Sequence, residues 1–217
     1  MWPPARKGSV LAVDFPPRVF VTGTDTGVGK TYVAALLAAG LGCAYWKPVQ
    51  TGADTDTDWV RRAAGLPVGC VLPEAYRLRE PLSPHEAARR EGVVIDMARL
   101  ALPDRERLVV EGAGGVMVPL NREYLMIDLI VALALPVVVV ARSELGTINH
   151  TLLTLEQLRR RDCSLLGVVV NGPANEANCR AIADYGRVDI LAAIDRREEL
   201  SPVNVAAVFA RYFGAYV

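Results

Sequence analysis

Short apolar runs rich in valine, isoleucine and leucine recur along the chain, and they constrain its fold more than any other feature. The runs are continuous rather than alternating, which is typical of strands buried on both faces of a parallel sheet. Six runs have this character: residues 18–22, 43–49, 107–111, 136–141, 165–171 and 188–193. Segments with helical spacing lie between them, at 30–41, 58–64, 84–91, 124–133, 148–161 and 175–185. This alternation predicts an α/β fold with a mostly parallel sheet and helices on both of its faces.

The length of 217 residues favours a single domain of this class. The first 17 residues stand apart, because four of them are proline and they contain no continuous apolar stretch of the kind found in signal peptides. We therefore expect a loosely ordered leader over residues 1–17 and one α/β domain over residues 18–217.

Composition argues against several classes of function. The 24 basic and 24 acidic residues give a formal net charge of zero, which does not favour binding to nucleic acid or to an anionic membrane. No apolar run reaches the roughly 18 residues that a membrane-spanning helix needs. The four cysteines form no C-x-x-C pair and only two histidines are present, so a structural zinc site is not expected. These observations favour a globular cytoplasmic protein with small-molecule partners.

The segment after the first predicted strand is the strongest functional signal. Ligands of parallel α/β sheets bind beyond the carboxyl ends of the strands, and here that position holds the sequence GTDTGVGKT, residues 23–31. The segment is one residue longer than the phosphate-loop pattern G-x4-G-K-[ST], because Thr24 occupies the first glycine position. Its glycines still let backbone N–H groups converge on phosphate oxygens, while Lys30 can reach the β- and γ-phosphates and the hydroxyl of Thr31 can bind Mg²⁺. A glycine-rich turn with an incidental lysine is the alternative, but the strand–loop–helix context favours a single-domain P-loop NTPase fold that binds a nucleoside triphosphate with Mg²⁺.

A second lysine, Lys47, lies at the end of the second predicted strand, with the hydroxyl of Thr51 shortly after it. A cation near the γ-phosphate would offset the charge that develops during phosphoryl transfer. An ordinary surface lysine is the alternative. The composition favours the functional interpretation, because Lys7, Lys30 and Lys47 are the only lysines among the 24 basic residues.

Acidic residues follow the second and third predicted strands. Asp54, Asp56 and Asp58 alternate ahead of a predicted helix, and Asp58 is placed either to cap that helix or to bind Mg²⁺. Glu111 ends the third strand, ahead of the small residues 112–115. It lies where a second acidic Mg²⁺ ligand is expected, the alternative being a solvated acid in a glycine-rich turn.

Six segments together resemble dethiobiotin synthetases, the ATP-dependent cyclo-ligases of biotin synthesis. They are GTDTGVGKT at 23–31, WKPVQTG at 46–52, LSPHEAA at 82–88, VEGAGG at 110–115, LGTINHTLLT at 145–154 and VVVNG at 168–172. Each segment alone would be weak, but the phosphate loop, the KPVQTG segment and the EGAGG segment form a specific combination.

The resemblance implies that 7,8-diaminopelargonic acid, CO₂ and ATP are converted into dethiobiotin, ADP and phosphate. One amine of the substrate traps CO₂ as a carbamate, whose oxygen attacks the γ-phosphate and forms a carbamic–phosphoric anhydride. The second amine then closes the ureido ring and expels phosphate. This chemistry needs charge neutralisation and alignment more than a general base.

The resemblance also implies roles for individual residues. Lys30 and Lys47 would be catalytic, holding the γ-phosphate and the carbamate, and Thr51 would contact the carbamate end of the substrate. Asn171 would read the adenine edge through its amide. The Mg²⁺ ligands would be Thr31, Asp58 and Glu111, with Asp56 as the alternative to Asp58. The nucleotide site would comprise Gly27, Val28, Gly29, Lys30, Thr31, Tyr32, Asp58, Glu111, Gly112, Ala113, Gly114, Asn171 and Gly172.

A helix start is implied as the site for the substrate carboxylate. In this family the helix belongs to the neighbouring subunit, and the matching residues here are Thr147, Ile148 and Asn149. The free N–H groups and the dipole at a helix N-terminus suit a carboxylate. The resemblance therefore implies a homodimer with its sites at the interface.

Two positions depart from the family pattern. Gly172 stands where the family often has aspartate, and residues 193–197 lack the Ile-Pro pair of some members. These departures leave the selectivity for the nucleotide base open. His85 and His150 lie in matching segments, and for both we favour packing or hydrogen bonding at a helix start over catalysis.

An ATP-driven switch protein of the partition or cell-division type is the main alternative. Those proteins share the fold but carry an extra lysine five residues before the invariant one, where this chain has Asp25. Residues 201–217 are mixed in character and do not predict a membrane-targeting amphipathic tail. A cobyrinate-type amidoligase is less favoured because no segment is left to encode a glutaminase domain. A non-catalytic nucleotide-binding module is less favoured because of the two lysines and two acids.

Overall fold

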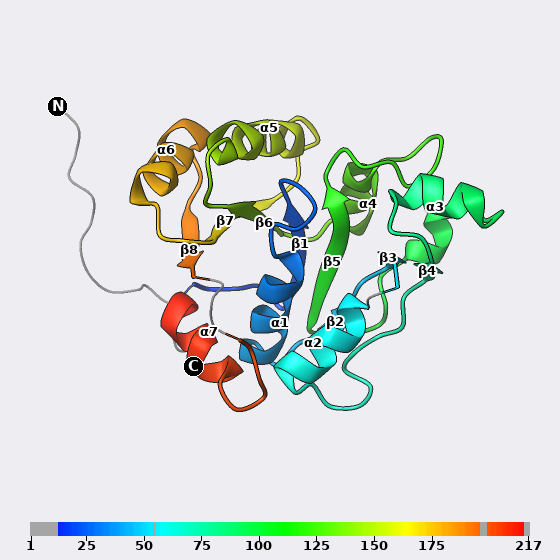
Figure 1. Ribbon diagram of the computed structural model, residues 1–217, viewed down its shortest axis with the longest axis horizontal. Helices are drawn as coiled ribbons and strands as arrows, with labels where there is room; N and C mark the ends of the chain where they lie inside the picture. The colour runs from blue at the N-terminus through cyan, green and yellow to red at the C-terminus, as the bar shows by residue number, and fades with distance from the viewer. Residues whose placement is uncertain (1–12, 54, 196–198, 215–217) are drawn as a thin grey trace.

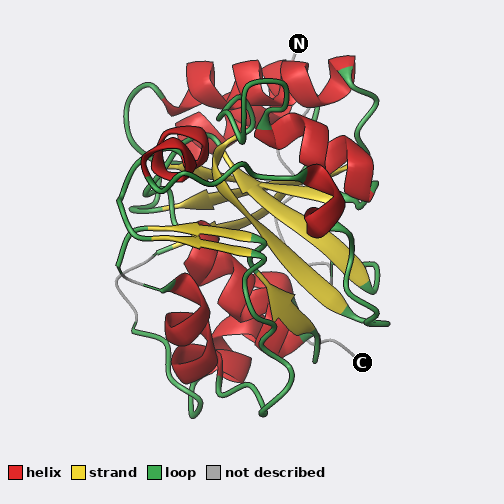
Figure 2. Cartoon of the chain, turned by 90° about the vertical axis from the view of Figure 1, so that its right-hand side faces the viewer, coloured by secondary structure: helices red, strands yellow, loops and turns green. Residues whose placement is uncertain are grey.

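The computed structural model describes residues 13–53, 55–195 and 199–214, and it confirms the α/β architecture. Six parallel strands form the central sheet in the order β2-β5-β1-β6-β7-β8. Helices lie on both sides of this sheet, so the domain has three layers (Figures 1 and 2). The strands of the sheet are β1 (Arg18–Gly23), β2 (Ala44–Trp46), β5 (Leu108–Gly115), β6 (Val137–Arg142), β7 (Leu165–Asn171) and β8 (Ile190–Ile194).

The helices agree with the predicted segments to within about one turn, apart from two elements that the sequence did not suggest. Those two are the 3₁₀ helix η1 (Met97–Leu100) and the last helix, α7 (Val205–Phe213). The others are α1 (Lys30–Gly40), α2 (Asp56–Ala64), α3 (Pro84–Arg90), α4 (Met126–Leu133), α5 (Thr147–Arg160) and α6 (Glu176–Gly186).

The predicted second strand, residues 43–49, is divided in the structure. Only Ala44–Trp46 pairs with β5, and the chain then leaves the main sheet at Lys47 and Pro48. It continues as β3 (Val49–Thr51), which pairs with β4 (Tyr76–Leu78) in a separate two-stranded sheet. Proline explains the break, because it has no N–H to donate and it restricts the residue before it.

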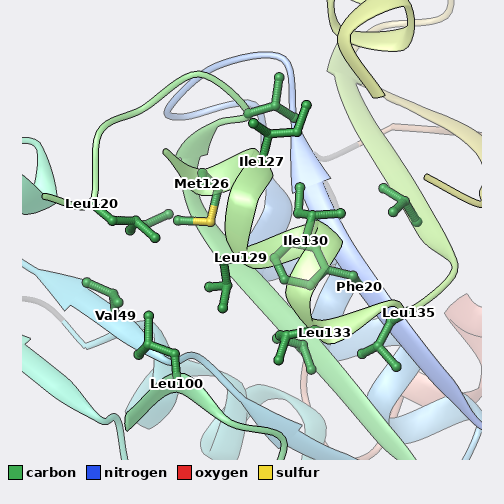
Figure 3. Packing of buried hydrophobic residues seen from close by; sticks show 14 of the residues in the cluster. Phe20, Val49, Leu100, Leu120, Met126, Ile127, Leu129, Ile130, Leu133 and Leu135 are labelled. Carbon is green, nitrogen blue, oxygen red and sulfur yellow. The ribbon is translucent and has the colours of Figure 1, made fainter. Parts of the chain in front are cut away.

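Apolar side chains of the central sheet supply two cores, one on each face. On β5, Leu108 and Val110 face the core beneath α3, α4, α5 and α6, whereas Val109 faces the core beneath α1, α2 and α7. Figure 3 shows Ile130 and Leu133 of α4 beside Phe20 of β1 in the first of these cores. Both faces of the sheet are therefore buried, as the continuous apolar runs predict.

Helix α7 was not predicted because the segment 201–217 looked mixed in character. The structure shows that Val205, Val208, Phe209 and Phe213 are buried and that the helix packs against α1. Their spacing of three, one and four residues places them on one helical face, which is the signal that sequence reasoning missed. The apolar face of α7 is thus part of the domain core. Among the described helices, none is long and apolar enough to cross a membrane.

The end of the predicted leader is packed against the domain. Phe15 is buried, and its ring lies edge-on to that of Phe213 with 5.5 Å between their centroids. The backbone N–H of Val13 also donates to the carbonyl of Phe213 at 3.1 Å. The rest of that leader, residues 1–12, lies outside the described residues.

The sheet order explains where a site can form. Strand β5 lies between β2 and β1, and all three run in the same direction. Val21 of β1 pairs with Glu111, and Trp46 of β2 pairs with Val110. Lys47, Glu111 and the segment after β1 therefore meet at one edge of the sheet, although they are far apart in the sequence.

Candidate active site

The loop between β1 and α1 has the backbone geometry of a phosphate-binding loop. Gly29 precedes α1 with a φ of 96°, a left-handed conformation that favours glycine. A Cβ at this position would also lie 2.0 Å from Nδ2 of Asn171, so glycine is required for space as well. Gly27 likewise has a positive φ of 76°. The loop ends at the first turn of α1, where backbone N–H groups have no partner within the helix.

Glu111 is a buried carboxylate that links three elements. The residue is 1% exposed. Its Oε1 accepts hydrogen bonds from Thr31 Oγ1 at 2.8 Å and from Lys47 Nζ at 3.0 Å. Its Oε2 accepts one from the hydroxyl of Tyr45 at 2.7 Å. Burial and the adjacent Glu111 raise the pKa of Tyr45 well above its usual value, so the phenol remains a donor.

Lys47 lies between two carboxylates. Its ammonium group contacts both Asp56 and Glu111, and its side chain is 7% exposed. Burial on its own would lower the pKa of Lys47, but the two carboxylates outweigh this effect and raise it. Lys47 therefore remains a cation inside the site.

Lys30 has a different environment. Its ammonium group donates to the carbonyl of Asp25 at 2.9 Å, across the phosphate loop. Burial lowers the pKa of Lys30 to about 8, and Lys47 adds to this effect, while Glu111, Asp56 and Asp25 oppose it. A phosphate group beside Lys30 would supply the negative charge that this buried cation lacks.

A cavity of about 630 Å³ opens beside these groups. Ten of the predicted site residues line it: Gly27, Gly29, Lys30, Thr31, Tyr32, Lys47, Thr51, Glu111, Ala113 and Gly114. The two lysines and Glu111 line the cavity together with Ser83 and Pro84 at the start of α3. The arrangement offers a phosphate loop, two cations and buried carboxylate oxygens around one space, which suits a bound triphosphate.

Comparison with known proteins supports this interpretation. A family model described as "AAA domain" matches residues 17–204. ATP-dependent dethiobiotin synthetase of Paramagnetospirillum magneticum is 55% identical over 191 residues, which cover 88% of this chain and 93% of the relative. The enzyme of the same name from Rhodopseudomonas palustris strain BisA53 is 51% identical over 91% of this chain and 94% of its own length. This chain belongs to the dethiobiotin synthetase family.

Solved structures agree on the fold. A ParA family ATPase from Chlorobium tepidum superposes with a TM-score of 0.56 at 11% identity, over 90% of this chain and 97% of that one. The septum site-determining protein MinD from Pyrococcus horikoshii, solved with Mg-ADP, gives a TM-score of 0.56 at 16% identity, over 88% and 92% of the two chains. At such low identity these likenesses support the α/β fold of this chain, of the kind seen in P-loop NTPases, and nothing more specific. Membership of an ATP-dependent P-loop family also implies a divalent metal bound with the nucleotide.

The structure places the two acidic residues of α2 in different surroundings. Asp56 lines the cavity and pairs with Lys47, whereas Asp58 does not line it and pairs with Arg61. The helix starts at Asp56, two residues earlier than predicted, with Thr55 as its cap. Residues two apart on a helix point about 200° away from each other. Asp58 therefore faces outward when Asp56 faces the cavity, and of the two residues weighed as Mg²⁺ ligands only Asp56 lines it.

Four further predicted residues, Val28, Gly112, Asn171 and Gly172, do not line the cavity. Val28 is buried, and its carbonyl accepts a 2.7 Å hydrogen bond from Nδ2 of Asn171. Oδ1 of Asn171 is buried without a hydrogen-bond partner in the described part of the chain. Gly112 packs against the ring of Phe20, and Gly172 packs against Ser143.

The start of α5 lies apart from the cavity of its own chain. The hydroxyl of Thr147 is turned inward and donates to the carbonyl of Arg142 at 2.5 Å, while Ile148 is half-buried and Asn149 is exposed. His150 lies 3.2 Å from Arg142 through Nδ1, and His85 donates its backbone N–H to Pro119. Neither imidazole lines the main cavity.

Sequence reasoning missed three residues that shape the site. Tyr45 holds Glu111 from inside the core. Gln50 lines the cavity and accepts the backbone N–H of Asp56 at 3.3 Å, so it supports the start of α2. Trp59 forms part of the wall next to Tyr32, with 6.3 Å between ring centroids. Gln50 lies inside the KPVQTG segment and was detectable, whereas the other two depend on distant contacts.

The lowered pKa of Lys30 predicts how nucleotide binding changes with pH. Below pH 8 the ammonium form is present in the free protein, and above it binding must first restore the proton. We expect the affinity for a non-hydrolysable ATP analogue with Mg²⁺ to fall above pH 8, approaching about tenfold per pH unit. Calorimetric titration between pH 7 and 9.5 measures this. Lys30→Arg, whose side chain stays charged, should give a flatter curve, and a wild-type curve equally flat would contradict the assignment.

Proposed function

We propose that this chain is an ATP-dependent cyclo-ligase that forms the ureido ring of dethiobiotin from 7,8-diaminopelargonic acid and CO₂. The observation that carries the proposal is the buried network in which Glu111 joins Thr31 of the phosphate loop to Lys47. The relatives at 50% identity or more, named as ATP-dependent dethiobiotin synthetases, support the same reaction. A cytoplasmic location, where ATP is supplied, is part of the proposal.

The chemistry divides into three bond changes. One amine of the substrate adds to CO₂ and loses a proton, giving a carbamate. A carbamate oxygen attacks the γ-phosphorus as the bond to ADP breaks. The second amine then attacks the carbonyl carbon of the anhydride, phosphate leaves, and the amine loses its proton as the ring closes. Each step gathers negative charge near the γ-phosphate, so fixed cations and alignment supply most of the catalysis.

Lys30 and Lys47 are suited to this task in complementary ways. Lys30 would contact the terminal phosphates from the loop, and the charge of the nucleotide would favour its ammonium form. Lys47 is held at the strand end by Glu111 and Asp56, so its position is fixed before substrate arrives. It would face the carbamate and the transferred phosphoryl group, with Thr51 beside it. Glu111 accepts three hydrogen bonds, so Thr31, Lys47 and Tyr45 already occupy both of its oxygens.

The oxygen atoms around Lys47 fit Mg²⁺. Thr31, Asp56 and Glu111 offer a hydroxyl and two carboxylates, the hard ligands that this ion prefers. No cluster of three or more histidine, cysteine, aspartate or glutamate side chains that could hold a metal exists among the described residues. An ion here would therefore need phosphate oxygens and water as further ligands, which is the usual manner of Mg²⁺ in nucleotide sites. Bound Mg²⁺ supplies neutralisation of the charge on the phosphate oxygens.

We propose that a second copy of this protein supplies the site for the substrate carboxylate. Val118 borders the main cavity and also a shallower hollow that Met117, His150 and Leu153 line. Two apolar side chains of this hollow are exposed, Leu153 at 56% and Met117 at 51%, and Leu145, just ahead of α5, is 97% exposed. A second subunit that covered this surface would bury them and bring the start of its own α5 towards the cavity. Residues Thr147, Ile148 and Asn149 of that subunit would then receive the substrate carboxylate.

Asn171 is suited to read the nucleotide base. Its Nδ2 is occupied by the carbonyl of Val28, which leaves Oδ1 as an acceptor for the amino group of adenine. Gly172 adds no side chain to this end of the site. Its φ of 139° and the close approach of Ser143 leave little room for one. Base selectivity would then depend mainly on Asn171.

The reaction is tested by phosphate release from ATP with each substrate omitted in turn. We expect release only when the diamine and bicarbonate are both present, because the carbamate is the group that attacks the γ-phosphate. Release that ignores both would instead favour a switch ATPase. Only the fold supports that alternative. Switch ATPases of this type carry an additional lysine five residues before the invariant one, and this chain has Asp25 there.

Asp56 and Asp58 provide a matched pair of variants for the metal site. Asp56→Asn should raise the Mg²⁺ concentration for half-maximal phosphate release at least about tenfold, because a cavity carboxylate is lost. Asp58→Asn removes the same charge two residues away, outside the cavity, and should leave that concentration within about twofold of wild type. Equal effects of the two substitutions, or a larger effect at Asp58, would contradict the placement.

A further inference from the structure

Tyr45 lies deep in the core and yet contacts the site. It is fully buried on β2, with Ala44 and Trp46 facing the opposite core. Its backbone pairs with Val109 of β5, and Glu111 follows two residues later on the same face of that strand. Two residues of a strand span about 6.6 Å, a distance that a phenol side chain can cover. The tyrosine hydroxyl therefore reaches Glu111 from within the protein, on the side away from the cavity.

The two oxygens of Glu111 are divided between two environments. Oε1 accepts from Thr31 and Lys47, both of which line the cavity. Oε2 accepts from Tyr45, which does not line it. The donors thus hold Oε1 towards the cavity and Oε2 towards the core. Rotation of the carboxylate would break the hydrogen bond from Tyr45.

We propose that Tyr45 is a positioning residue that orients the Glu111 carboxylate for the divalent metal of the nucleotide complex, by holding Oε2 in the core and leaving Oε1 to the cavity. The inference rests on the proposed function, because it assigns Glu111 to the metal. Groups that hold a metal-binding side chain from behind fix its orientation, and their loss usually weakens metal affinity by tenfold or more. Without the hydroxyl, Oε2 is left without a donor and the carboxylate is free to rotate out of this orientation.

Tyr45→Phe tests the role, since it removes the hydroxyl and keeps the ring in the core. Tyr76→Phe is the matched control. Tyr76 is buried too, at 6% exposure, and its hydroxyl accepts the backbone N–H of Asp96 at 2.9 Å, outside the cavity. Binding of a non-hydrolysable ATP analogue is titrated with Mg²⁺ and followed by calorimetry, and again without metal in EDTA. Thermal unfolding of each variant establishes that it is folded at the titration temperature.

We expect Tyr45→Phe to raise the Mg²⁺ concentration for half-maximal binding about tenfold, with unchanged affinity in EDTA. Tyr76→Phe should match wild type in both titrations. A Tyr45→Phe titration that superposes on wild type, or an equal loss with and without metal, would overturn the positioning role while leaving the proposed function intact. Nucleotide binding by wild type that does not respond to Mg²⁺ would overturn both.

Discussion

The carboxylate of Glu111 is inside the protein, and the arrangement of the site depends on how its charge is satisfied. An isolated buried carboxylate is strongly unfavourable, so it must be paired and hydrogen-bonded. Tyr45 of β2, Thr31 in the first turn of α1 and Lys47 just after β2 each donate to it. Lys47 also pairs with Asp56, the first residue of α2, and this ion pair holds the start of α2 at the site. One charge thereby ties four parts of the chain together at the cavity.

The parallel sheet makes this network possible. Its strands β2, β5 and β1 are neighbours and end at one edge, which brings Lys47, Glu111 and the phosphate loop within hydrogen-bond distance. Pro48 then turns the chain out of the sheet, so that the next residues wall the cavity instead of extending β2. The resulting site holds two cations of different character. Lys47 is fixed by carboxylates, whereas Lys30 is buried with a lowered pKa, and we propose that a phosphate group is its partner.

Features that depend on local sequence were predictable, and features that depend on distant partners were not. The phosphate loop, Lys47 and Glu111 each lie at or just after the carboxyl end of a strand. Because neighbouring parallel strands end at the same edge of the sheet, their closeness could be predicted from the sequence. Whether Asp56 or Asp58 faces the cavity depends on where α2 begins. Thr55, which caps the helix, and Gln50, which accepts the backbone N–H of Asp56, help to set that position. Tyr45 escaped notice because its partner is 66 residues away. Helix α7 was missed because a short apolar stripe becomes recognisable only against α1.

A crystal structure with Mn²⁺ and a non-hydrolysable ATP analogue tests the central claim most directly, because the anomalous signal of the ion locates it without ambiguity. The account predicts one peak at the cavity, within bonding distance of Thr31, Asp56 and Glu111, with Tyr45 still bound to the other oxygen of Glu111. Asp58 should remain paired with Arg61. A peak bound by Asp58, or a nucleotide-bound ion that makes no contact with Glu111, would contradict the account.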